Sequence, residues 1–92
     1  MRKKWELLYR DILRAKPQVS FKIEDDLHGE QKLNRIWISL DTRCPPAKIY
    51  IHECLYLIRP DFSEHQVRVW EGVIWRRLTA RQKLTLYRRM FR

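Results

Sequence analysis

Residues 49–58 read Ile-Tyr-Ile-His-Glu-Cys-Leu-Tyr-Leu-Ile, an apolar run interrupted by one histidine and one carboxylate. Prolines stand at both limits, at positions 45 and 46 before the run and at position 60 after it. Proline fits the first turn of a helix and disfavours helical backbone at the residue before it. We therefore predict a central helix at about 47–58, apolar nearly all round and the most buried helix of the fold. His52 and Glu53 on such a helix need polar partners.

The residues before this helix show one helical and two strand periods. In residues 3–15 apolar side chains recur at i, i+3, i+4, i+7 and i+8, and Pro17 marks the end of the predicted helix. Residues 18–24 and 34–40 alternate apolar and polar side chains, which predicts two half-buried strands. Because we take the link between them as short, we expect the two strands to be antiparallel.

The residues after the central helix carry two helix-start signals. Ser63 is followed three residues later by Gln66, and Thr79 by Gln82, as in capping boxes. These signals predict a third and a fourth helix. The expected architecture is an α+β fold of order α-β-β-α-α-α, with a two-stranded antiparallel sheet packed on helices. A chain of this length supports one core, so residues 1–92 are expected to form a single domain.

Composition limits the class of protein. Two cysteines are too few for a disulfide framework, which fits a reducing compartment. The sequence has no signal peptide and no apolar stretch of membrane-spanning length. We therefore expect a cytoplasmic location and no membrane span. No deaminase signature accompanies Cys44 and Cys54, since His-x-Glu and Pro-Cys-x-x-Cys are both missing.

The net charge of +9 is unevenly distributed. Residues 72–92 hold seven basic residues and no acidic one, and residues 1–16 are also basic, whereas residues 17–71 are mildly acidic. Basic ends permit contact with nucleic acid or with an acidic protein partner. A solvated helical surface explains the same charges without a partner. The four tryptophans suit core and rim packing better than base stacking.

The His52-Glu53 pair stands where zinc hydrolases place the start of their metal motif. In His-Glu-x-x-His on a helix, two imidazoles four residues apart bind zinc, and the glutamate activates the zinc-bound water as general base. Here the position of the second histidine holds Tyr56, and Glu64 follows near the predicted start of the next helix. A phenol ionises only near pH 10, so tyrosine is a poor neutral-pH replacement for imidazole.

The wider pattern His-Glu-Cys-Leu-x-x-x-x-Pro-Asp-Phe-Ser-Glu, with the strand at residues 35–41 before it and Val67 and Trp70 after it, resembles the minimal gluzincins. These are very small zincin-like metallopeptidases with one domain. The resemblance covers about residues 34–75 and implies a zincin-like fold, zinc as cofactor and a peptide or protein substrate.

Carried over position by position, the resemblance makes His52 the first metal ligand, Glu53 the general base and Glu64 the third ligand. Tyr56 stands at the second ligand, which leaves the motif degenerate. We therefore expect a metallopeptidase-like domain that is impaired or inactive; an active form would hydrolyse peptide bonds with zinc and Glu53.

The sequence leaves several interpretations of the metal site open. His65 or His28 would have to supply a replacement ligand, or Tyr56 would have to bind as phenolate. Alternatively, tyrosine fills a former metal pocket and the polar residues bond to their surroundings. The competing class of function is a non-enzymatic basic module that contacts nucleic acid or an acidic protein.

Overall fold

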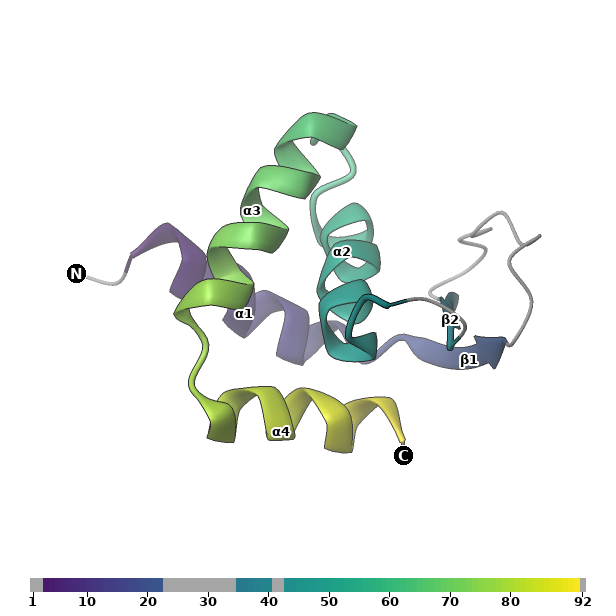
Figure 1. Cartoon of the computed structure of the whole chain (residues 1–92). Coiled ribbons are helices and arrows are strands. Elements are labelled where there is room, and N and C mark those ends of the chain that lie inside the picture. Colours follow the sequence, from purple (N-terminus) through teal and green to yellow (C-terminus); the bar gives the residue numbers. More distant parts are fainter. Residues whose placement is uncertain (1–2, 23–34, 41–42, 92) are drawn as a thin grey trace.

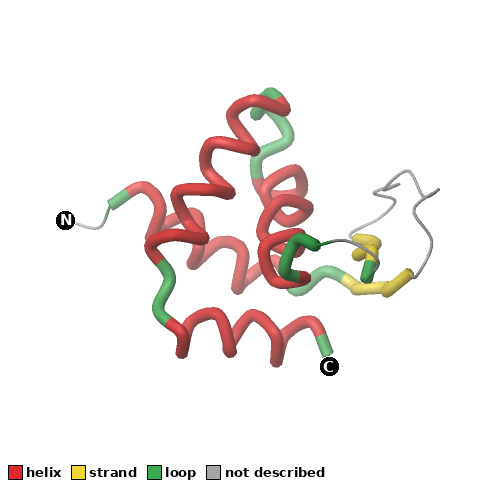
Figure 2. The backbone as a smooth tube through the Cα atoms, viewed as in Figure 1, coloured by secondary structure: helices red, strands yellow, loops and turns green. Residues whose placement is uncertain are grey.

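The chain has four helices and a small two-stranded sheet in the order α-β-β-α-α-α. A computed structural model describes residues 3–22, 35–40 and 43–91. Helix α2 (Pro46–Ile58) lies beside α3 (Glu64–Arg77), α1 (Lys4–Ala15) crosses them, and α4 (Ala80–Met90) runs beneath (Figure 1). The strands β1 (Gln18–Lys22) and β2 (Arg35–Ser39) lie at one side of the helices (Figure 2). The predicted α+β class and element order are confirmed.

Helix α2 is the central element, as its sequence predicts. It packs against α1, α3, α4 and β2. Its first helical residue is Pro46, where the missing N–H costs nothing, and the backbone N–H of Arg59 closes the last turn on the carbonyl of Leu55. Fully or almost fully buried side chains line it. A helix in contact with four other elements has little surface left for solvent, which explains its apolar composition.

The sheet is parallel, so the predicted antiparallel pairing is wrong. Val19 of β1 pairs with Ile36 of β2, and Phe21 pairs with Ile38. Parallel strands need a connection of about a dozen residues or more. The segment 23–34 between the strands has that length, which the expectation of a short link overlooked. The in-register pairing puts the apolar residues of both strands on one face, and Ile36 and Ile38 are completely buried.

The core gathers side chains from all four helices and β2. Alternation on β2 and the helical stripe on α1 place the predicted residues inside, with Leu8 and Ile12 buried. No helix within the described ranges is both long enough and apolar enough to cross a membrane. The buried core comprises Leu8, Tyr9, Ile12, Ile36, Ile38, Ala47, Tyr50, Ile51, Cys54, Leu55, Val67, Ile74, Leu78, Leu86 and Met90.

Both predicted capping boxes are present. Ser63 Oγ accepts a hydrogen bond from the N–H of Gln66 at 3.1 Å, and Gln66 Oε1 accepts one from the N–H of Ser63 at 2.8 Å. Thr79 and Gln82 repeat this pattern at the start of α4. Each box satisfies backbone donors that the first turn of a helix leaves without an internal acceptor. The short sequence signal therefore fixes where both helices begin.

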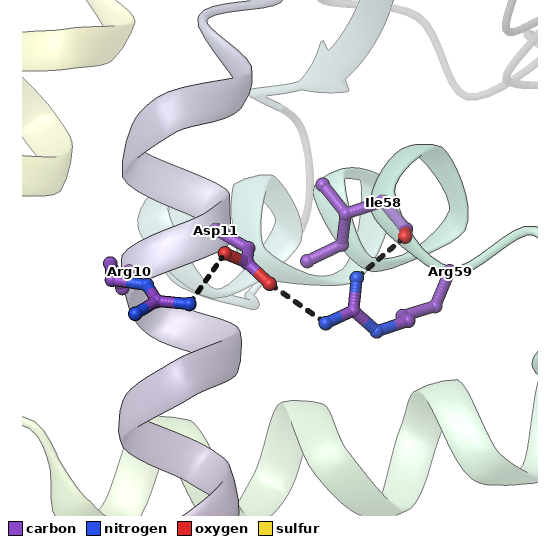
Figure 3. Close-up of polar contacts among 4 residues, drawn as sticks. All are labelled: Arg10, Asp11, Ile58 and Arg59. Carbon is purple, nitrogen blue, oxygen red and sulfur yellow. Dashed lines mark hydrogen bonds and ion pairs between the residues drawn. The ribbon is translucent and has the colours of Figure 1, made fainter. Parts of the chain in front are cut away.

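An ion pair fastens the end of α2 to α1 (Figure 3). Arg59 Nη2 lies 2.7 Å from Asp11 Oδ2, and Nη1 of the same guanidinium donates to the carbonyl of Ile58 at 2.8 Å. Arg10 adds a second, longer contact to Asp11 at 3.5 Å. The guanidinium thus binds a last-turn carbonyl of α2 and a carboxylate of α1 together, and this holds the two helices in one relative position.

Candidate functional site

His52 lies in α2 on the side that meets α3. Its neighbours Ile51 and Leu55 are completely buried, whereas the His52 side chain is 21% exposed. Helical geometry therefore puts this imidazole at the edge of the core, and its polar atoms need partners there. The candidate site is built around it.

The partner of His52 is Glu71, a residue that the sequence motif did not include. The distance from His52 Nδ1 to Glu71 Oε1 is 3.2 Å, and the Glu71 side chain is only 16% exposed. Glu71 lies on α3 seven residues after Glu64, which is about two helical turns. Its spacing from Glu64 and Arg68 on one face of α3 is the signal that points to it. Which turn of that face meets His52 depends on how the two helices pack.

Glu71 controls the protonation of His52. The hydrogen bond to the Glu71 carboxylate is the main cause that raises the pKa of His52 above its ordinary value of 6.5. Burial acts in the opposite direction, and the charges of Glu71 and Glu53 raise the pKa further. A carboxylate at Nδ1 stabilises the imidazolium and fixes a proton on that nitrogen in the neutral form. His52 therefore donates to Glu71 in both protonation states.

Tyr56 contacts His52 one helical turn further along α2. The two ring centroids are 5.1 Å apart and the ring planes meet at 71°, an edge-to-face contact. Burial raises the pKa of Tyr56, and the carboxylates of Glu64 and Glu53 raise it further. The phenol is thus held in its protonated form, which opposes binding of a metal as phenolate. We call His52, Tyr56 and Glu71 the His52 cluster.

Glu64 lies at the exposed start of α3, where its charge still acts on Tyr56. It is the first residue of α3, its side chain is 66% exposed, and its Oε1 lies 3.0 Å from Nη2 of Arg68. Glu53 is half-buried beside His52. Of the residues that the resemblance assigned, the fold therefore brings His52, Glu53 and Tyr56 together on α2, and Glu64 is engaged in a surface ion pair of α3.

The resemblance implies a catalytic zinc site in this part of the fold. Such a site needs three protein ligands around one ion. Among residues 3–22, 35–40 and 43–91, no group of three or more His, Cys, Asp or Glu side chains is arranged to hold a metal ion. His65 is exposed on the first turn of α3, and His28 lies outside the described residues. The arrangement fits a hydrogen-bonded contact between two helices.

Neither cysteine has the properties of a nucleophile that would act with the cluster. Cys44 precedes α2, and its closest electrostatic neighbours include Lys48 and Glu71. Burial raises the pKa of the Cys44 thiol; Lys48 opposes the shift and Glu71 adds to it. A thiol whose pKa is raised is a poor nucleophile at neutral pH. Burial likewise raises the pKa of Cys54 to about 12, as expected for a core cysteine.

Trp70 and Trp75 each have a lysine ammonium above one ring face. Lys83 Nζ lies 4.2 Å from the ring centroid of Trp75, and Lys4 Nζ lies 5.0 Å from that of Trp70. These cation–π contacts occupy ring faces on which a nucleic-acid base would have to stack. The packing interpretation of these two tryptophans fits their surroundings.

No protein-family model, no curated protein and no solved structure matches this chain. The class of protein is therefore defined by the fold and the cluster themselves. It is a small α+β domain in which a polar cluster joins two helices and arginines dominate the C-terminal third.

Proposed function

We propose that this chain is a zincin-like domain without peptidase activity. Its function is then to bind another molecule rather than to cleave it. The observation that carries the proposal is the His52–Glu71 contact of 3.2 Å, with Tyr56 where a zincin has its second imidazole. His52 then serves to join α2 to α3. Without a second imidazole to complete a zinc site, Glu53 would not serve as a general base toward zinc-bound water.

The obstacle to activity is the second ligand rather than His52. Zinc-binding histidines usually donate their other ring nitrogen to a carboxylate, and the Glu71 contact at Nδ1 leaves Nε2 for another role. One imidazole is still two ligands short of a catalytic site. We therefore expect a histidine at position 56 to increase metal binding more than any substitution of Glu64, because Glu64 already pairs with Arg68.

The test compares the parent, Glu53→Gln, Tyr56→His and Tyr56→His/Glu53→Gln. Native mass spectrometry measures zinc content, and a casein assay measures hydrolysis. We expect neither stoichiometric zinc nor cleavage for the parent, and a gain of zinc for Tyr56→His because it restores two imidazoles four residues apart. Zinc-dependent cleavage by the parent that disappears in Glu53→Gln would contradict the proposal.

A second candidate function is binding of nucleic acid or an acidic protein. The observation that favours it is the run of exposed arginines at the end of α3 and along α4: Arg76, Arg77, Arg81 and Arg88. No acidic residue occurs after Glu71 to neutralise them. Counterion release makes binding to nucleic acid strongest at low salt. A gel-shift assay at low salt in which no nucleic acid binds would reject nucleic acid as the partner.

A further inference from the structure

A hollow of about 460 Å³ opens beside β1, where the end of α4 approaches the sheet. The link from α1 and the first residues of β1 form one wall, and the last turn of α4 forms another. Stacking of Phe21 of β1 on Phe91, with ring centroids 4.9 Å apart, holds these parts together. Figure 1 shows this end of α4 next to β1. The hollow shares no lining residue with the His52 cluster.

Three cations from three different elements line the hollow. Lys16 caps the end of α1, Arg35 begins β2, and Arg89 lies in the last turn of α4. None of the described residues that line it is acidic. Like charges gathered at one place repel one another, and an anion placed among them removes that cost.

The two guanidinium groups have donors to offer. Arg35 is held in place by Gln18, whose Oε1 accepts from Nε at 3.3 Å and from Nη2 at 3.0 Å. That pairing does not use Nη1 of Arg35. Nη1 of Arg89 is buried and has no hydrogen-bond acceptor within the described part of the chain. Because Nη1 is shielded from solvent, Arg89 contributes to the hollow through its charge and through the rest of its half-buried side chain.

Part of the hollow's lining is apolar, although polar groups make up more of it. Val19, Tyr50 and Met90 line it together with Pro17, and Tyr50 and Met90 are almost fully buried. A volume of this size lies in the range of small-molecule sites, which combine an apolar surface with a few placed polar groups. The paired N–H donors of an arginine guanidinium group match the spacing of phosphate oxygens. A ligand that contacts both the cations and the apolar residues has a phosphate group and an organic portion.

We propose that this hollow binds an organic phosphate, with Lys16, Arg35 and Arg89 on the phosphate and the organic portion on the apolar part of the lining. The proposal goes beyond the function proposed above, because it concerns another part of the molecule. A free phosphorylated metabolite and the 5′-phosphate of a nucleic-acid strand present the same chemistry.

The test is calorimetric titration of the full chain at about 150 mM salt, which suppresses diffuse charge effects. The probes are adenosine 5′-monophosphate, adenosine, and a short oligonucleotide with and without a 5′-phosphate. We expect the monophosphate to bind at least about tenfold more tightly than adenosine, because charge-assisted hydrogen bonds supply the difference. A phosphorylated oligonucleotide that outbinds the monophosphate assigns the phosphate to a strand end, and the reverse order assigns it to a small molecule. Equal affinities for monophosphate and adenosine, or binding of neither, overturn the proposal.

Neighbouring arginines give a matched control. Arg89→Gln and Arg88→Gln remove the same charge from the same turn, but Arg88 is exposed and does not line the hollow. We expect Arg89→Gln to weaken monophosphate binding about tenfold or more and Arg88→Gln to change it less than about twofold. Equal losses in both variants overturn the proposal. If circular dichroism shows Arg89→Gln unfolded, Arg35→Gln replaces it, with exposed Arg43→Gln as control and the same outcomes.

Discussion

Tyr56 and His52 show how one substitution changes the role of its neighbour. A histidine four residues after His52 would offer a second ring nitrogen to a shared ion. Tyrosine offers an aromatic edge and a phenol that burial and nearby carboxylates keep protonated. The remaining imidazole then interacts with Glu71 across the helix pair. At this scale the cluster is a joint between α2 and α3 that responds to pH.

The first prediction at the residue scale concerns Glu71→Gln. Glutamine keeps the shape but removes the carboxylate whose hydrogen bond chiefly raises the pKa of His52 and whose charge raises it further, so we expect that pKa to fall. A raised pKa in the folded state gives stability that is fully present below about pH 6.5 and is lost as pH rises through the folded pKa. The free energy of unfolding of the parent should therefore exceed that of Glu71→Gln by about 1 kcal/mol near pH 6, and by less near pH 8. NMR titration of His52 and urea unfolding at both pH values measure these effects.

Glu64→Gln is the matched control, because it removes the same charge from an exposed position of the same helix. Its effect on the pKa of His52 should be small, since Glu71, Glu53 and Arg68 are the charged side chains that set it. If the pKa of His52 is the same in Glu71→Gln as in the parent, the contact between His52 and Glu71 does not depend on the Glu71 carboxylate.

At the scale of elements, α2 was the easiest part to predict and the sheet the hardest. Flanking prolines and an apolar run fix the ends and burial of α2 within its own sequence. The relative direction of the two strands depends on how residues 23–34 connect them. The alternation of apolar and polar residues within each strand does not reveal that direction. Glu71 was missed for a related reason. Its spacing on α3 was visible, but the packing of α3 on α2 decides that Glu71 and not Glu64 reaches His52.

The prediction at the element scale concerns the ion pair between α1 and α2. The hydrogen bond from Arg59 is the main cause that lowers the pKa of Asp11, although partial burial opposes it. A lowered pKa gives stability that is present above the unfolded value of about 3.8 and is lost as pH falls through the folded pKa. Arg59 is 35% exposed, so solvent screening reduces the gain.

We therefore expect Asp11→Asn to cost about 0.5–1 kcal/mol of unfolding free energy at pH 7 and clearly less at about pH 2.5. Denaturant titrations at the two pH values measure the difference. Asp61→Asn, at an exposed position in the turn after α2, serves as the control and should stay within about 0.5 kcal/mol of the parent. A loss for Asp11→Asn that is the same at both pH values would mean that packing, and not the ion pair, is responsible.

At the scale of the whole molecule, the positive charge separates into two kinds of surface. The hollow beside β1 gathers cations from three elements around a partly apolar lining, which suits one small anion. At the end of α3, Arg76 and Arg77 line a second hollow together with Val73. Arg81 and Arg88 are exposed along α4, and these four arginines together suit diffuse contact with a polyanion. The two surfaces predict different responses to salt. Binding in the hollow keeps a specific component at physiological ionic strength, whereas diffuse contact weakens steeply.

This difference gives the last prediction, for any nucleic acid that binds at low salt. Each phosphate contact adds about 0.9 to the slope of log K against log salt for duplex DNA. Arg76→Gln/Arg77→Gln should therefore reduce the slope by about 2 if both arginines contact phosphates. Arg14→Gln/Arg43→Gln removes the same charge from exposed positions elsewhere and should leave the slope within about 0.5 of the parent. Fluorescence anisotropy at several salt concentrations measures the slopes. Equal reductions in both double variants would mean that net charge alone, and not the end of α3, attracts the strand.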